Sequence, residues 1–444
     1  MPSSPVPTGA PPAEAPETPV AVDAAQMRRV ALSSLLGTVV EYYDFLLYGT
    51  VAALVFGTAF FPEASVAAGT VAAFGTFAAG YVARPLGGII FGHFGDRLGR
   101  KKMLVLTMVL MGAASALIGL LPDYRAIGIA APVLLVLLRI VQGLAIGGEW
   151  GGATLMVVEH AAPGRRGAWS GVMQSGTSLG FLLSAGVVAA ANALLTPEQF
   201  MSWGWRVPFL VSVVLMAVGL YTRLKVTESP LFREAAEKAA ESEAPRIPLL
   251  TVLKQPRTAL LAAAVGLGPF ALTGLITTYM LTYATGIGYS VGEVMNALLV
   301  ISAIGLFTIP AFAALSDRLG RRRVVLGAAA LGLVAIKPVY DLVDSGSPGL
   351  LVLGMSLVMV VQHAMFAPLA PMLSELFGTR VRYTGASLGY QMSALVGSGL
   401  VPLAASSLHA AYPGSTPLVL LAGGCILASL LAAWRLRETR GDAL

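Results

Sequence analysis

Long apolar segments alternate with short polar segments along most of the 444-residue chain. A helix needs about 20 largely apolar residues to cross the hydrocarbon core of a bilayer. Twelve segments meet this requirement and are predicted to be membrane-spanning helices: 30–58, 66–91, 103–121, 131–158, 168–194, 204–223, 258–285, 291–315, 324–343, 349–373, 384–406 and 414–434. The pattern therefore predicts an all-α membrane protein.

One long polar interruption divides the predicted helices into two sets of six. The predicted organisation is a disordered tail over 1–27, an N-terminal six-helix bundle over 28–223, a cytoplasmic loop over 224–257, a C-terminal six-helix bundle over 258–436 and a short tail over 437–444. The first tail is rich in Pro and Ala and lacks the apolar core of a secretory signal, which favours disorder.

The composition is typical of a protein in lipid. Charged residues make up 12% of the chain, against about 25% in soluble domains. The net charge of +6 does not indicate a nucleic-acid partner, because the basic residues lie in short clusters between apolar segments. The single cysteine, Cys425, excludes a cysteine-based metal site. No cofactor or metal is predicted, and the absence of a P-loop motif argues against ATP as the driving force.

Basic residues are strongly biased to one side of the predicted topology. Of the 29 Lys and Arg residues, 24 fall on one side and only Arg125 and Arg206 on the other. Arg84, Arg139 and Lys337 lie inside predicted spans. Since Lys and Arg are retained in cytoplasmic loops, both termini are predicted to be cytoplasmic.

An internal repeat relates the two sets of helices. The string DRLGR occurs at 96–100 and again at 317–321, after the second and eighth predicted helices. A second pair of residues, Glu159 with Arg166, has the same seven-residue spacing as Glu375 with Arg382. Two parallel six-helix halves of this kind suit alternating access, in which one half rocks against the other around a site near the middle of the membrane.

The two DRLGR copies resemble the loop signature of the major facilitator superfamily. The segments GTVVEYYDFLLYG (37–49), ARPLGGIIFGHFGDRLGRKK (83–102) and RIVQGLAIGGEWGGA (139–153) resemble, more narrowly, its metabolite:proton symporter family. That family includes bacterial transporters for proline/betaine, α-ketoglutarate, shikimate and citrate. The resemblance implies a transporter of the bacterial inner membrane, not an enzyme, that takes up a small organic solute with protons. No obligate protein partner is implied.

Two other functions stay open at this point. One is a proton-coupled antiporter or exporter of the same superfamily, although the fifth predicted span lacks the Gly-Pro pair usual in such exporters. The other is a solute sensor that does not transport, although the loops are too short to hold an output domain.

The DRLGR loops are predicted to gate the cytoplasmic side. Glycine permits a tight turn and close helix approach, the aspartate can accept hydrogen bonds where the next helix begins, and arginine can pair with carboxylates across the seam between the halves. The predicted gating residues are Gly92, Asp96, Arg97, Gly99 and Arg100 in the first half and Asp317, Arg318 and Arg321 in the second, with Gly95 also permitting close approach.

Polar residues inside the spans are the candidates for transport chemistry, since a charge there costs about 2.5–3.5 kcal/mol. Helical spacing places Glu41, Asp44 and Tyr48 on one face of the first span and Arg139, Gln142 and Glu149 on one stripe of the fourth. The predicted proton-coupling residues are Glu41, Asp44, Glu149 and His363, and the predicted substrate-binding residues are Arg84, Arg139, Gln142 and Tyr48.

Depth along the helices adds one specific expectation. At about 1.5 Å per residue, Glu41, Arg84, Glu149 and His363 all lie roughly 12–16 Å from the cytoplasmic helix ends. Arg84 is therefore expected to pair with Glu149 or Glu41. Lys337 and its neighbour four residues on are expected to form a structural pair in a peripheral helix.

Overall fold

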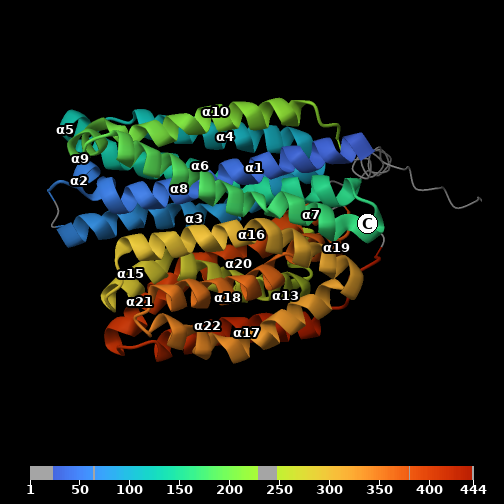
Figure 1. Cartoon of the computed structure of the whole chain (residues 1–444). Coiled ribbons are helices and arrows are strands. Elements are labelled where there is room, and N and C mark those ends of the chain that lie inside the picture. The colour runs from blue at the N-terminus through green and yellow to red at the C-terminus, as the bar shows by residue number, and fades with distance from the viewer. Residues whose placement is uncertain (1–23, 64–65, 229–247, 380, 443–444) are drawn as a thin grey trace, which may run out of the picture.

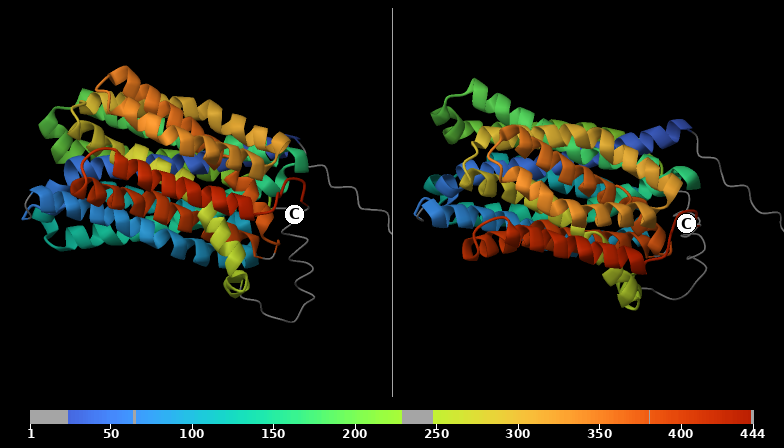
Figure 2. Two further views of the ribbon diagram at one scale, coloured as in Figure 1. Left: turned by 90° about the horizontal axis from the view of Figure 1, so that it is seen from below. Right: turned by 60° about the horizontal axis from the view of Figure 1, so that its bottom comes forward.

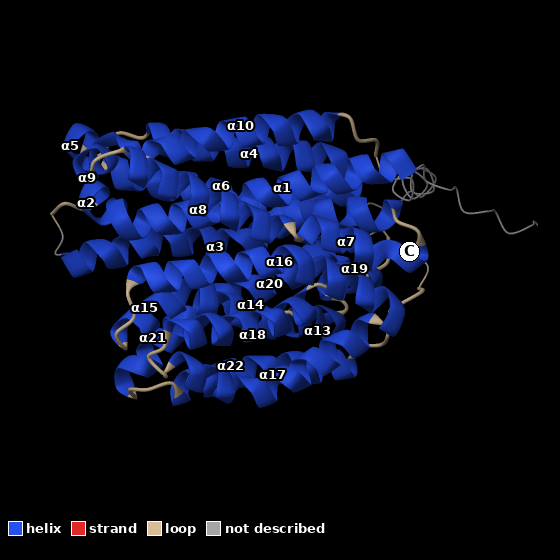
Figure 3. Ribbon diagram, viewed as in Figure 1, coloured by secondary structure: helices blue, strands red, loops and turns tan. Residues whose placement is uncertain are grey.

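The computed structural model describes residues 24–63, 66–228, 248–379 and 381–442. The predicted tail over 1–27, apart from residues 24–27, and most of the predicted loop over 224–257 lie outside the described residues. Figure 3 shows helices joined by short loops, and no strand occurs in the described ranges.

Two bundles of long helices lie side by side, one formed by residues up to 228 and the other by residues from 248 onward (Figure 1). The long helices of the N-terminal bundle are α1 (Ala24–Val51), α3 (Val66–Leu98), α4 (Arg100–Leu120), α6 (Ala130–His160), α7 and α8 (Arg166–Gln174 and Gly176–Leu194) and α10 (Arg206–Leu224). Short segments extend or join them: η1 (Ala52–Phe56), α2 (Gly57–Phe60), α5 (Tyr124–Ile127), η2 (Pro163–Arg165), α9 (Pro197–Gln199) and η3 (Phe200–Gly204).

The C-terminal bundle contains more interrupted helices. Its spans are α13, α14, η4 and α15 (Pro256–Val265, Leu267–Thr273, Gly274–Tyr279 and Met280–Gly286), α16 (Val291–Leu319), α17 (Arg321–Val343), α18 and α19 (Pro348–Phe366 and Leu369–Leu376), α20, η5 and α21 (Arg382–Ala394, Leu395–Leu400 and Val401–Ala411) and α22 (Thr416–Arg435). The short α12 (Pro248–Leu253) precedes them. The segments η4 and η5 are π-helical turns, which often occur at functional positions.

Twelve long helices agree with the predicted fold. Eleven helical segments of the described ranges are long and apolar enough to cross a membrane. The remaining one, α3, is 33 residues long. Helix α1 begins at Ala24, before the predicted start at residue 30. The prediction of an all-α membrane protein with two six-helix bundles is confirmed.

Both copies of DRLGR lie at the same end of the molecule, which we call the basic end. Figures 1 and 2 show that α1 begins and the chain ends there. In each copy the glycine takes a positive φ, 108° at Gly99 and 103° at Gly320. Since only glycine adopts this backbone readily, the residue allows the chain to turn sharply between two long helices.

Apolar packing holds each bundle and also joins the two at the basic end. The interior of the C-terminal bundle contains the buried rings of Tyr283 and Tyr340. A further cluster contains residues of both bundles, and in it Trp150 of α6 stacks on Tyr390 of α20 with ring centroids 3.6 Å apart. Apolar packing therefore extends across the seam between the bundles.

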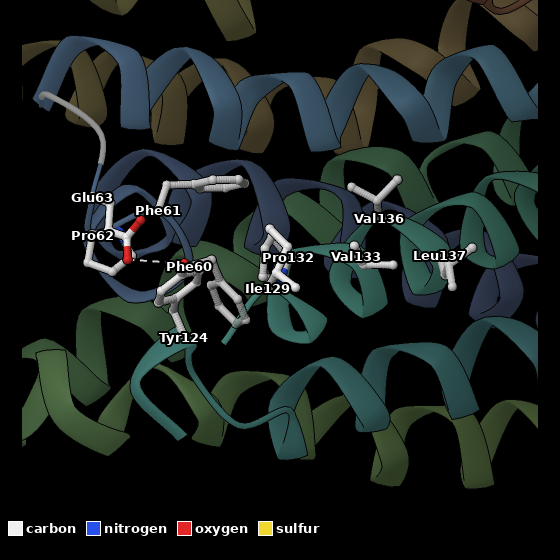
Figure 4. A pocket seen from close by; sticks show the side chains of 10 residues that line it. All are labelled: Phe60, Phe61, Pro62, Glu63, Tyr124, Ile129, Pro132, Val133, Val136 and Leu137. Atoms are coloured by element: carbon white, nitrogen blue, oxygen red, sulfur yellow. Dashed lines mark hydrogen bonds between the residues drawn. The ribbon is translucent and has the colours of Figure 1, made fainter. Parts of the chain in front are cut away.

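A cavity of about 470 Å³ lies at the opposite end of the N-terminal bundle, between α2, α5 and α6 (Figure 4). Its walls are almost entirely apolar, and Ile129, directly before α6, and Val133 and Leu137 of α6 are exposed on it. The one polar contact drawn is a hydrogen bond of 3.2 Å from the Tyr124 hydroxyl to Glu63. None of the predicted site residues lines this cavity.

Candidate functional site

The first DRLGR copy contacts the start of a helix in the other bundle. Asp96, in the last turn of α3, accepts hydrogen bonds from the backbone N–H groups of Tyr383 and Thr384 at 3.2 and 3.1 Å, and from the Thr384 hydroxyl at 2.9 Å. These N–H groups belong to the first turn of α20, where a carboxylate is favoured by the helix dipole. Asp96 was expected to bind the start of the next helix along the chain, so that prediction is wrong about the helix.

The second copy makes the symmetry-related contact. Asp317, in the last turn of α16, accepts hydrogen bonds from the N–H groups of Gly167 and Ala168 at 2.9 and 2.8 Å, in the first turn of α7. It also accepts one from Arg321 at 2.6 Å. Each bundle therefore presents one carboxylate to the beginning of a helix in the other.

Two buried ion clusters lie beside these contacts. Glu159 is 2.9 Å from Arg100 of its own bundle and 3.2 Å from Arg382 of the other. Glu375 is 3.5 Å from Arg321 of its own bundle and 3.3 Å from Arg166 of the other. All six side chains are at most 5% exposed. Breaking such a pair by removing one partner typically costs about 3–5 kcal/mol, because it leaves a buried charge unpaired.

The remaining predicted gating residues divide into two groups. Gly92 lies against α20, where a Cβ would come within 2.8 Å of the Thr384 Cα atom, and a Cβ on Gly95 would overlap the Tyr383 ring. Glycine is needed there for close approach. By contrast, Arg97 and Arg318 are exposed at the surface.

Charges in the middle of the membrane are confined mostly to the N-terminal bundle. Arg84 of α3 is 6% exposed and lies over the rings of Phe45 and Tyr81, at 5.0 and 4.5 Å. It forms no hydrogen bond or ion pair within the described residues. Arg84 is also the strongest charged neighbour of Glu41, which is 2% exposed.

A second arginine of the same bundle lies farther from the basic end than Glu149, ten residues earlier on α6. Arg139 of α6 lies 4.2 Å from the Tyr48 ring and donates to the Gln142 side chain at 3.1 Å. Asp44, 1% exposed, faces Arg139 and Ser115, but neither carboxylate oxygen has a hydrogen-bond partner in the described ranges. The predicted group of Asp44, Tyr48, Arg139 and Gln142 is therefore brought together.

Glu149 has a partner that the sequence analysis missed. Arg223 of α10 forms a buried ion pair with both oxygens of Glu149. Thr107 also donates to Glu149 at 2.7 Å, and Arg223 donates to the carbonyl of Leu104 at 2.6 Å. The expected Arg84–Glu149 pair is thus wrong, because Arg223 occupies the carboxylate. Arg223 is the last residue of the predicted span 204–223, and this position was the only signal in the sequence that could have identified it.

A cavity of about 50 Å³ lies in the seam, walled by both bundles. The N-terminal bundle contributes Tyr42 and Ser178, and the C-terminal bundle contributes Thr273, Gln362 and His363. Further lining residues are Thr177, Phe181, Phe270, Thr277, Ile301, Ser302, Ile309, Met359 and Phe366. The side chains of Gln362 and His363 are held by hydrogen bonds of 2.9 Å to Thr273 and 2.8 Å to Thr308. His363 therefore lies in the seam, as a candidate relay or ligand residue must.

Lys337 and Asp341 form the expected ion pair one turn apart on α17. Both side chains are 54% exposed, so the pair lies on the outer surface of the C-terminal bundle.

Comparison with known proteins agrees with this architecture. Residues 34–336 and 302–443 match the family model described as Major Facilitator Superfamily. The chain belongs to the major facilitator superfamily. It is 42% identical to the shikimate transporter of Escherichia coli K12 over 410 residues, which is 91% of this chain and 93% of the relative. It is 34% identical to the glycine betaine/proline/ectoine/pipecolic acid transporter OusA of Dickeya dadantii, covering 87% of this chain and 78% of the relative.

Among solved structures, the proton:xylose symporter XylE bound to 6-bromo-6-deoxy-D-glucose shares the fold, with a TM-score of 0.73. It is 16% identical, and the match covers 95% of this chain and 98% of XylE. This superfamily member is therefore a multi-pass membrane transporter and not an enzyme.

Proposed function

We propose that this transporter takes up a small organic carboxylate together with protons across the bacterial inner membrane, by alternating access. The observation that carries the proposal is Arg84: a guanidinium buried at the seam, with no acceptor among the described residues. A guanidinium presents N–H groups in the fork geometry that a carboxylate fits. The solute's carboxylate is the acceptor that Arg84 lacks.

A small cavity in the seam, which Arg84 does not line, favours a solute with hydroxyl groups. Thr273, Thr277, Ser302, Gln362 and Ser178 supply hydroxyl and amide groups around one small space. The relative at 42% identity is named as a shikimate transporter, which agrees with a hydroxylated carboxylate. A zwitterionic osmolyte, suggested by the name of the 34% identical relative, also carries a carboxylate and is the competing solute class.

Uphill uptake needs a group that binds a proton and a gate that prevents leakage. Glu41 and Asp44 are buried carboxylates on one helix, each facing an arginine, and we assign them the proton. We assign the gate to the Asp96 and Asp317 contacts, which hold the basic end closed. If the basic end faces the cytoplasm, with both termini there, this arrangement corresponds to a closed inner side. One relative is named an inner membrane metabolite transport protein.

The substrate test uses purified protein in proteoliposomes with an imposed pH gradient. Labelled shikimate, α-ketoglutarate, citrate, proline and glycine betaine are offered separately, and accumulation is measured with and without the gradient. We expect gradient-dependent accumulation of shikimate, and competition between shikimate and the acids it resembles. Accumulation of betaine alone would contradict the hydroxylated-acid assignment, and uptake of every solute independent of the gradient would contradict proton coupling.

Topology is tested separately. A reporter fused within 224–257 should be cytoplasmic, because this loop belongs to the side that holds 24 of the 29 basic residues. A periplasmic reporter would reverse the proposed orientation and with it the assignment of the inner gate.

A further inference from the structure

We infer that Glu149 and Arg223 form the inner exit for the transported proton, through the interior of the N-terminal bundle and not through the seam. The proton passes from Glu41 to Glu149 and from there to water at the basic end. This inference rests on the proposed proton coupling, and it assigns a role to Arg223 and to a crevice that the solute does not use.

The geometry of Arg223 is the first observation. Its helix, α10, ends at Leu224 at the basic end, yet the Arg223 side chain is only 3% exposed. The guanidinium is directed inward, to Glu149. On α6, Glu149 lies eleven residues before the helix end at His160, which is about 16 Å along the axis. The pair therefore links the basic end of the bundle to the layer of Glu41.

The second observation is the close approach of α1. A Cβ on Gly37 would lie 2.6 Å from a Glu149 carboxylate oxygen. With no side chain at position 37, α1 packs directly on the pair, and Glu41 follows one turn later on the same face. Arg84, Glu149 and Arg223 are the charged groups that act on Glu41.

Several helices around Glu149 contribute polar or charged groups, and α3 contributes Arg84, which acts on the same Glu41 as Glu149 does. Helix α10 contributes Arg223, α4 contributes the Thr107 hydroxyl and α1 contributes Glu41. From the other bundle, α20 contributes Tyr383, whose hydroxyl donates to the carbonyl of Gly148 at 2.7 Å. Arg223 is the cation that pairs with Glu149, and the Thr107 hydroxyl donates to the same carboxylate.

The third observation is a crevice that reaches Arg223 from the basic end. It lies between α1, α4, α6 and α10, and its polar lining residues are Ser33, Ser34, Lys101 and Arg223. Its volume of about 10 Å³ is close to the space that one water molecule needs. All four helices belong to the N-terminal bundle, so this route does not require the seam to open.

Protonated Glu41 gives its proton to the Glu149 carboxylate, so Glu41 becomes a carboxylate beside Arg84 and Glu149 becomes a neutral acid. Arg223 remains a cation and keeps its hydrogen bond to the carbonyl of Leu104. Glu149 then releases the proton to water in the crevice and re-forms the ion pair with Arg223. The net result is one proton moved from Glu41 to the basic end.

The test separates solute movement from proton movement in proteoliposomes, with labelled shikimate as the probe. Exchange of labelled for unlabelled shikimate needs no net proton release, whereas accumulation driven by a pH gradient does. For Glu149→Gln and for the double variant Glu149→Gln/Arg223→Gln, we expect exchange within about twofold of the unmodified protein and at least a tenfold loss of accumulation. The double variant removes both charges, which avoids the unpaired buried charge that a single change leaves.

The matched control is Arg206→Gln, at the first position of the same helix. Arg206 donates only to backbone carbonyls, those of Ser202 and Leu121, so both measurements should be unchanged. If the double variant accumulates shikimate as well as the unmodified protein, the proton leaves by another route and the inference is wrong. Loss of exchange and accumulation together, with Arg206→Gln normal, would also overturn it by making the pair structural. If the unmodified protein shows exchange but no gradient-driven accumulation, the proposed function fails instead.

Discussion

The two bundles carry matching residues at the basic end and different residues in the middle of the membrane. At the basic end, Asp96 and Asp317 each contact the start of a helix in the other bundle, and Glu159 and Glu375 each join two arginines. In mid-membrane the match ends. When the two halves are aligned by the DRLGR copies and by Glu159 with Glu375, the residues that correspond to Arg84, Arg139 and Glu149 are Gly305, Met355 and Met365.

This difference separates two tasks. Closing a passage between two halves requires groups on both sides of the seam, so symmetric contacts suffice. Binding a proton and a solute requires charged groups in a low-dielectric interior, and each costs free energy unless it has a partner. Concentrating these groups in one bundle leaves the other with an apolar interior of tyrosine, methionine and aliphatic side chains. The N-terminal bundle is therefore expected to carry the coupling chemistry.

The largest effect is expected from the two arginines of the N-terminal bundle. Arg84→Ala removes the proposed partner of the solute carboxylate, a charge-assisted contact worth about 1.5–3 kcal/mol, so the apparent Km should rise roughly 10- to 150-fold. Arg84→Lys should recover part of this loss, since an ammonium keeps the charge but not the fork. The measurement is the concentration dependence of initial uptake.

Substitutions of Arg139 are expected to affect accumulation as well. Arg139→Ala should abolish accumulation, because it leaves Asp44 buried without its cation. If Arg139 contacts the solute, Arg139→Lys should raise the apparent Km; an unchanged Km would assign Arg139 to the support of Asp44 alone. Normal uptake by both alanine variants would contradict the functional difference between the bundles.

Glu41 and Asp44 should show a different pattern. Glu41→Gln and Asp44→Asn preserve shape but cannot carry a proton, so exchange of labelled solute should continue while gradient-driven accumulation is lost. A tenfold proton gradient supplies about 1.4 kcal/mol per proton, which corresponds to about a tenfold solute gradient. That gradient should collapse in the variants. If both still concentrate solute, Glu149 and then His363 become the candidates for the proton site.

Sequence patterns predicted most of this fold and the depth of the site because both follow from one-dimensional periodicities. Span length set the helices, and a rise of about 1.5 Å per residue placed Glu41, Arg84 and Glu149 in one layer. Depth does not say which helices are neighbours or how they are rotated. Arg84 was therefore predicted as a partner of Glu149, whereas the partner is Arg223. Arg223 did not stand out in the sequence because its backbone lies at a helix end.

Asp96 illustrates the same limit at the basic end. The sequence indicated that its carboxylate would bind N–H groups at the start of a helix, which is the case. Those groups lie 287 and 288 residues away along the chain, on a helix that approaches because position 92 is glycine. The repeat contained this information, since Arg166 and Arg382 mark the starts of the two accepting helices.

The two gate carboxylates should differ moderately. Asp96→Ala should slow initial uptake by about tenfold and Asp317→Ala by only two- to threefold, corresponding to about 1.4 and 0.5 kcal/mol. The second contact has additional support, because the tail residue Thr439 donates to Glu375 at 2.7 Å and Arg166 donates to the carbonyl of Asp442 at 2.8 Å. The closed gate can therefore tolerate the loss of Asp317 better.

Thiol labelling reports the gate directly. In a Cys425→Ser background, Ser387→Cys places a thiol at a fully buried position of the seam, which should react faster with a membrane-impermeant reagent applied to the basic end when Asp96→Ala opens the gate. Equal labelling rates with and without Asp96→Ala, together with normal uptake, would remove the gating role of Asp96.

The smallest effect is expected from the charged pair of the C-terminal bundle. Lys337 and Asp341 lie 54% exposed on α17 and form an ion pair only with each other among the described residues, and an exposed pair one helical turn apart contributes about 0.3–0.5 kcal/mol. The double variant Lys337→Ala/Asp341→Ala should therefore leave the apparent Km, the accumulation ratio and the exchange rate unchanged and shift the thermal unfolding midpoint by no more than about 1–2 °C. The comparison variant is Glu149→Gln/Arg223→Gln. It removes a buried pair from the other bundle that likewise consists of one acidic and one basic side chain. If the Lys337/Asp341 variant lost accumulation while keeping its thermal stability, charges of the C-terminal bundle would take part in coupling, and the assignment of that chemistry to one bundle would be wrong.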